Sequence, residues 1–132
     1  MFSGCSSLET LNLSNWDTSN VTDMSSMFSS CNALIELDIS HFNVDNVTSF
    51  SGFTACYALK TLKMPKFDFT KKTSLSSFFS SCKSLEIIDL TGWDTSKITD
   101  MSYMFSNCES LTEIIGFEDL DVSKVTNMSY MF

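Results

Sequence analysis

The sequence predicts an α/β repeat protein, in which each repeat gives one short parallel strand to one face of a stack and one short helix or helical turn to the opposite face. Two observations carry this prediction. Five near-repeats fill residues 1–26, 27–51, 52–77, 78–103 and 104–130, and Met131-Phe132 begin a sixth. Within each repeat, a segment with apolar residues at helical spacing precedes a segment in which they alternate.

The segment around each repeat boundary is predicted to be helical. Met24, Met27, Phe28 and Cys31 stand at positions i, i+3, i+4 and i+7, which share one face of an α-helix. Asp23, just before them, suits the cap or first turn of a helix. Repeat two is one residue short at Phe50-Ser51-Gly52-Phe53, so we expect a weakened or tightened turn there.

The strand prediction comes from the pattern Leu8-x-x-Leu11-x-Leu13. Its strict alternation places Leu11 and Leu13 toward the core and Asn12 toward solvent. Pro65 matches the position just after this pattern in repeat three, and because proline lacks an N–H donor the strand is predicted to end by that point. A turn then leads into the next helical segment.

When the repeats are aligned, residues of one kind fall into columns. The phenylalanine column holds Phe2, Phe28, Phe53, Phe79, Phe105 and Phe132. The cysteine column holds Cys5, Cys31, Cys56, Cys82 and Cys108. A single repeat is too small to bury its own apolar face, so stacking of repeats must supply the core. We therefore expect one array across residues 1–132; because neither end carries a polar capping repeat, we expect it to be a fragment of a longer array.

Composition excludes several classes of function. Eight Lys against 16 acidic residues give a net charge of −8, the opposite of what nucleic-acid binding requires. The hydrophobic content of 43% argues against disorder, and no apolar run approaches the roughly 20 residues of a membrane helix. With one histidine, His41, no G-x-S-x-G motif and no glycine-rich phosphate loop, we expect neither catalysis nor a cofactor.

The Leu-x-x-Leu-x-Leu core with a period near 26 is typical of leucine-rich repeats. The segments MFSGCSSLETLNLSNWDTSNVTDMSS (1–26) and FFSSCKSLEIIDLTGWDTSKITDMSY (78–103) resemble the BspA-like leucine-rich-repeat surface proteins, and the resemblance spans the chain. It implies a leucine-rich-repeat-like solenoid, at the cell surface or secreted, that adheres to proteins or to host and matrix surface molecules. An intracellular interaction scaffold and a structural spacer of a surface protein remain alternatives, because the chain carries no export signal.

Two polar columns allow structural and metal-binding interpretations. The cysteines are predicted to be buried free thiols, because adjacent strands lie about 4.8 Å apart whereas bridged Cβ atoms average about 3.8 Å; disulfide or metal roles are the alternatives. The column Asp17, Asn43, Asp68, Asp94 and Asp121 is predicted to cap turns, with a calcium ladder as the alternative. A threonine ladder for ice binding, suggested by Thr18 and Thr95, is interrupted in the other repeats.

The residues singled out for partner binding lie on the outward face of the predicted strands. Repeat three is the only positively charged repeat, and Asp38, Lys63 and Asp89 should form one outward column. This column predicts either cross-repeat salt bridges or, with Lys66, a partner-binding patch. The candidate partner-binding residues are therefore Asn12, Asp38, Lys63, Lys66 and Asp89.

Overall fold

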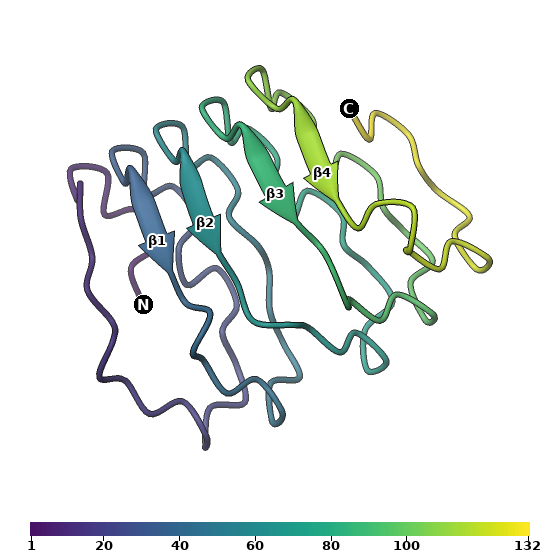
Figure 1. Cartoon of the computed structure of the whole chain (residues 1–132), viewed down its shortest axis with the longest axis horizontal. Helices are drawn as coiled ribbons and strands as arrows, with labels where there is room; N and C mark the ends of the chain where they lie inside the picture. The colour runs from purple at the N-terminus through teal and green to yellow at the C-terminus, as the bar shows by residue number, and fades with distance from the viewer.

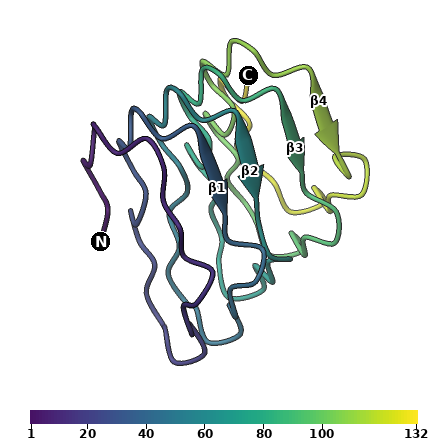
Figure 2. The same ribbon diagram turned by 60° about the vertical axis from the view of Figure 1, so that its left-hand side comes forward.

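The computed structural model describes all residues from 1 to 132. It contains four strands of three residues each: β1 (Glu36–Asp38), β2 (Thr61–Lys63), β3 (Ile87–Asp89) and β4 (Glu113–Ile115). Successive repeats lie side by side, with the strands in chain order along one side of the molecule (Figure 1). The turned view shows that loops and turns complete each repeat behind the strands (Figure 2). We call the side that bears the outward-facing strand residues the strand-side face.

The prediction of an α/β, leucine-rich-repeat-like solenoid is wrong. The structure has no helix on the side opposite the strands or elsewhere. Its strands form two separate two-stranded parallel sheets, β1–β2 and β3–β4, rather than one continuous ladder. The rest of the chain consists of turns, bends and irregular segments.

Backbone hydrogen bonding explains why the predicted helices do not form. Alternate N–H groups in these segments bond to the next repeat instead of to their own turn. In repeats three and four, those of Leu75, Ser77, Phe79 and Ser81 donate to the carbonyls of Asp100, Ser102, Met104 and Ser106 at 2.8–3.0 Å. The intervening N–H groups of Phe78 and Ser80 donate three residues back. An α-helix requires each N–H to bond four residues back, so the two patterns exclude each other.

Left-handed residues close each of these turns. Ser77 and Ser81 have φ values of 58° and 64°, and Ser26 and Ser30 have 52° and 61° at the matching places. A positive φ at the third residue of a turn is typical of type II turns and interrupts any right-handed helix. The apolar spacing that suggested a helix is thus produced by successive tight turns whose apolar residues still face inward.

The core runs the length of the stack and includes the predicted columns. The six phenylalanines form a row of nearly parallel rings, with centroids 5.4–6.0 Å apart and interplanar angles of 8–14°. Such offset stacking adds to the burial energy of each ring. In the strands the middle residue points inward, and Leu37, Leu62 and Ile88 are buried between exposed neighbours. This alternation confirms the inward and outward assignment made from the sequence.

The sheet is interrupted between β2 and β3. No backbone hydrogen bond joins these strands, although repeats three and four remain bonded on the opposite side, where the Phe53 N–H donates to the Phe78 carbonyl at 2.6 Å. A cavity of about 300 Å³ lies beside the interruption and is lined by Leu62, Pro65 and Trp93, among others. Because β2 ends at Lys63, the prediction that the strand ends by Pro65 is confirmed.

Candidate functional site

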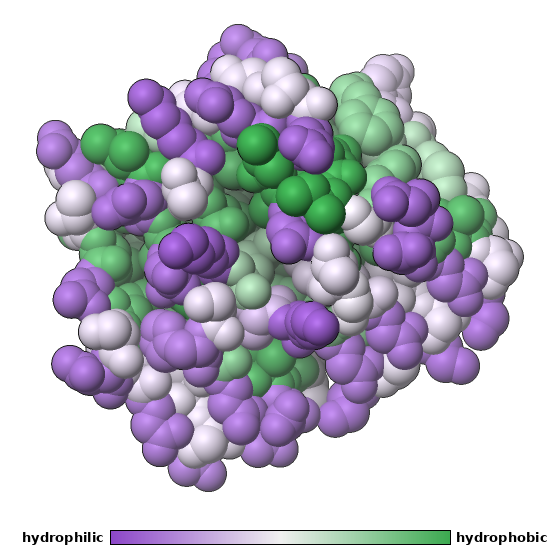
Figure 3. All heavy atoms as spheres, viewed as in Figure 1, coloured by the Kyte–Doolittle hydropathy of each residue, from purple (hydrophilic) through white to green (hydrophobic).

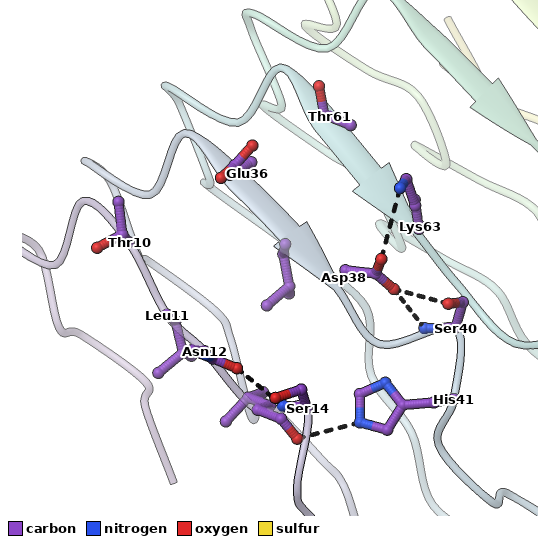
Figure 4. Close-up of a pocket in the computed structure, with 12 residues that line it drawn as sticks. Thr10, Leu11, Asn12, Ser14, Glu36, Asp38, Ser40, His41, Thr61 and Lys63 are labelled. Carbon is purple, nitrogen blue, oxygen red and sulfur yellow. Dashed lines mark hydrogen bonds and ion pairs between the residues drawn. The ribbon is translucent and has the colours of Figure 1, made fainter.

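The largest hollow on the strand-side face is a groove of about 740 Å³ across the first three repeats. Three successive outward positions, Thr10, Glu36 and Thr61, lie along its upper part, and Asn12, Asp38 and Lys63 lie along its lower part (Figure 4). The alternation of the strands explains this arrangement, because residues two apart point to the same side.

Three of the five candidate residues support their own backbone. Oδ1 of Asn12 accepts a hydrogen bond from the Ser14 N–H at 3.0 Å, and Oδ1 of Asp89 accepts one from the Thr91 N–H at 2.8 Å. Oδ1 of Asp38 accepts from both the N–H and the hydroxyl of Ser40 at 3.0 and 2.7 Å. These are Asx turns, in which the side chain bonds to the backbone two residues later. They hold the backbone in place directly after β1 and β3 and at the matching position of repeat one.

Hydrogen bonding also favours the ionised form of these carboxylates. The bonds from Ser40 lower the pKa of Asp38, and the bonds from Thr91 lower the pKa of Asp89, because they stabilise the ionised form. Lys63 and Lys66, respectively, contribute smaller electrostatic effects in the same direction. Both carboxylates are therefore negative at neutral pH.

The predicted column of cross-repeat salt bridges forms in only one of its two halves. The Lys63 ammonium lies 3.5 Å from Oδ2 of Asp38, and both side chains remain more than half exposed. Asp89 makes no salt bridge with Lys63, because β2 and β3 are not paired. Instead, Lys63, Lys66 and Asp89 line the 300 Å³ cavity between those strands. The five candidate residues thus divide between two hollows that share Lys63.

Sequence reasoning missed three residues of the groove whose side chains make no hydrogen bond within the protein. The side chains of Thr10, Glu36 and Thr61 are exposed and make no hydrogen bond, yet all three line the large groove. The rule that outward residues alternate would have identified them, since each stands two positions before a candidate. His41 also lines the groove, where Nε2 lies 3.0 Å from the Leu13 carbonyl oxygen.

The cysteine column is structural where repeats cover both of its sides. All five cysteines are free thiols, and Cys31, Cys56 and Cys82 are buried as predicted. Cys108 is half-buried and Cys5 is exposed, so the prediction of burial is wrong for Cys5. The thiols of Cys31, Cys56, Cys82 and Cys108 each donate to the carbonyl of a phenylalanine in the preceding repeat, at 3.1–3.2 Å. Burial raises the pKa of Cys56 to about 12, so its thiol stays protonated and unreactive at neutral pH.

The aspartate column caps turns, as predicted. The N–H two residues later donates to Oδ1 of Asp17, Asn43, Asp68, Asp94 and Asp121 at 2.7–3.0 Å. The structure brings together no group of three or more His, Cys, Asp or Glu residues that could hold a metal ion. Thr18 and Thr95 are buried and donate to carbonyls of the next repeat, so the ice-binding interpretation of these threonines is wrong.

These features define a class of repeat protein built from stacked turns and short parallel strands, with a polar groove on the strand-side face. The chain belongs to the family described as Mycoplasma protein of unknown function, DUF285, whose profile matches residues 1–86 and 73–132. No curated protein and no solved structure shows significant similarity to it. The structure holds no helix of the length and apolarity needed to cross a bilayer.

Proposed function

We propose that this chain is a non-catalytic recognition segment that binds protein or cell-surface partners through its strand-side face. The observation that carries the proposal is the 740 Å³ groove, in which outward side chains from three consecutive repeats are held at strand spacing without internal partners. A recognition surface needs such side chains, because a polar group that already has its hydrogen bonds has little to offer a ligand.

The frame beneath the groove supports this role. The six-ring phenylalanine stack and the backbone bonds between repeats set the positions of Thr10, Glu36 and Thr61 relative to one another. Binding by a preorganised surface avoids the entropic cost of ordering it. The exposed Asp38–Lys63 pair adds a positive and a negative group at the lower rim. Because exposed pairs contribute little to stability, this one is available for exchange with charges of a partner.

Adhesion at the cell surface is the cellular role that we propose, supported by the resemblance to BspA-like surface proteins and consistent with membership of a repeat family. An intracellular scaffold would use the same face for a cytosolic protein. A spacer would use no face at all. These possibilities differ in the location of the protein and in whether it binds anything saturably.

The test is binding of the purified chain to intact host cells and immobilised matrix proteins, compared with a Glu36→Lys variant. Reversing the charge in the middle of the groove should weaken saturable binding about tenfold, because it leaves a partner's cation facing a like charge. Asp45→Lys, an equal charge reversal at an exposed turn, should leave binding unchanged. Absence of saturable binding at micromolar concentration would support the spacer. Labelling of intact cells with a membrane-impermeant reagent separates surface exposure from an intracellular location.

A further inference from the structure

The two halves of the strand-side face differ in chemistry. In the β1–β2 half, the outward residues are Glu36, Asp38, Thr61 and Lys63. In the β3–β4 half they are Ile87, Asp89, Glu113 and Ile115. Figure 3 shows hydrophobic residues gathered over β3 and β4, with hydrophilic residues around them, whereas hydrophilic residues dominate over β1 and β2.

In the β3–β4 half, apolar and acidic side chains alternate both along each strand and from one strand to the next. In the parallel register Ile87 stands beside Glu113, and Asp89 stands beside Ile115. Ile87 and Ile115 are 48% and 43% exposed, whereas Ile88, which points inward, is only 1% exposed. Isolated exposed apolar residues are common on protein surfaces, but these two share one face of one sheet at diagonal positions, about 8 Å apart from strand geometry. We call these four residues the checkerboard.

No cationic side chain forms a salt bridge with the acidic residues of the checkerboard. Neither Asp89 nor Glu113 takes part in a salt bridge; the salt bridges of the chain are Lys63–Asp38 and Lys83–Glu109. Lys66 acts on Asp89 only through a minor electrostatic effect. In the β1–β2 half, by contrast, Lys63 lies 3.5 Å from Asp38, and Glu36 is the one acidic residue without a salt bridge. A cation brought to the checkerboard therefore gains attraction that the molecule itself does not supply.

We propose that the checkerboard binds an extended basic segment of a partner protein, one face of which carries cationic and aliphatic side chains in alternation. Lysine or arginine groups of this segment pair with Asp89 and Glu113, and its aliphatic side chains cover Ile87 and Ile115. An extended segment fits the surface, because its side chains on one face recur at roughly 7 Å, the spacing at which apolar and acidic residues alternate along each strand of the checkerboard. This inference rests on the proposed use of the strand-side face and names the class of partner for one half of it.

The test uses the whole chain and a defined probe, with binding measured by calorimetry. The probe is a capped octapeptide in which lysine and leucine take turns at every second position and serine stands between them, so that lysine and leucine share one face of an extended segment. We call it the lysine–leucine peptide. One comparison peptide, the lysine–serine peptide, has serine in place of every leucine, and the other has glutamate in place of every lysine. Two double variants probe the site: Ile87→Ser with Ile115→Ser, and Asp89→Asn with Glu113→Gln. The Asp89→Asn change keeps the oxygen that accepts from the Thr91 N–H, so the Asx turn is retained. The matched control, Glu9→Gln with Asp45→Asn, removes the same charge from exposed positions outside the checkerboard.

Each checkerboard variant should weaken binding of the lysine–leucine peptide about tenfold, and the control by less than about twofold. Both comparison peptides should bind at least about tenfold more weakly than the lysine–leucine peptide. If the control variant lost as much affinity for the peptide as the charge variant, net charge alone would explain the effect and the proposal would be overturned. Equal binding of the lysine–serine peptide would remove the role of the isoleucines. If the isoleucine variant fails to fold, the charge variant still decides. If cells or matrix bind the chain but the checkerboard variants do not change that binding, this inference fails while the proposed function stands.

Discussion

Gly52 occupies the tightest contact between two repeats, and replacing it with alanine should destabilise the protein strongly. A Cβ atom at this position would lie 1.9 Å from the carbonyl oxygen of Phe78, and within 2.8 Å of two further backbone atoms of that residue. Because these are backbone atoms, no side-chain rotation relieves the clash. The aligned position holds Met27 in repeat two and Phe78 in repeat four, so glycine is specific to this junction.

The size of the effect follows from what must move. Repeats three and four would have to separate by about 1.1 Å to reach a contact of 3.0 Å, well beyond thermal adjustment of a packed core. This movement strains the packing by about 1–3 kcal/mol and disrupts the Phe53 N–H to Phe78 carbonyl bond, worth about 1 kcal/mol. The lower chain entropy of alanine in the unfolded state offsets about 0.5 kcal/mol. The expected loss in the free energy of unfolding is therefore about 1.5–3.5 kcal/mol.

The assay is urea unfolding followed by tryptophan fluorescence, since Trp93 is buried among the aromatic residues at this junction. Gly4→Ala is the matched control. Its Cβ would meet nothing within 4 Å, but its φ of +76° is unfavourable for alanine, so a loss of about 1 kcal/mol is expected. A Gly52→Ala protein within about 1 kcal/mol of the unmodified chain would show that the close approach has no energetic importance.

Three further predictions test the core and the turns. Iodoacetamide at pH 8 should modify the exposed Cys5 rapidly and leave Cys56 unmodified in the native state, because Cys56 is buried and has a pKa of about 12. Mass spectrometry would measure the two rates of modification, and equal rates would contradict the burial of Cys56. Burial lowers the Lys72 pKa to about 8, but the Lys72 ammonium also donates to the Phe50 carbonyl. Because these effects offset each other, Lys72→Val should change stability at pH 7 by less than about 1 kcal/mol. In the unmodified chain, unfolding should show stability rising between pH 8 and 10.5 as the folded state sheds this proton first; the variant should lose that rise. The pKa of Asp100 is lowered, mainly by the hydrogen bond from the Ser102 N–H. The stability that Asp100 contributes is therefore present above about pH 4 and is lost as the pH falls through its folded-state pKa. Thermal unfolding of Asp100→Asn should depend less on acid pH than that of the unmodified chain, and an unchanged dependence would contradict this role of Asp100.

Much of the interior could be predicted from residue columns. Phenylalanine recurs at one phase of the repeat, and its rings do stack through the molecule. Asp17 and its counterparts cap turns, a local interaction between residues two apart that sequence alone specifies. These predictions succeeded because each depends on one repeat meeting an identical neighbour, or on a contact within one turn.

The helices could not be excluded from the sequence. Residues spaced at i, i+3, i+4 and i+7 face one way on a helix, and they also do so on consecutive turns that each close after three residues. The choice depends on where N–H groups such as that of Phe79 find acceptors, and the carbonyl of Met104 in the next repeat provides one. The candidate site shows the same division: Asp38 and Lys63 pair as expected, but Asp89 does not join them because the strand ladder is interrupted.

By itself, the sequence of this protein determined the repeat phase, the inward and outward alternation of each strand, the turn-capping aspartates and the net acidic charge. These features follow from local chemistry and periodicity. The tertiary structure alone decided that backbone donors bond between repeats rather than within helices and that the sheet divides between β2 and β3. It also placed an acidic and apolar checkerboard without salt bridges beside a groove in which Lys63 pairs with Asp38. These outcomes depend on contacts between repeats that differ from one another at single positions such as Gly52, and a shared pattern cannot report such differences.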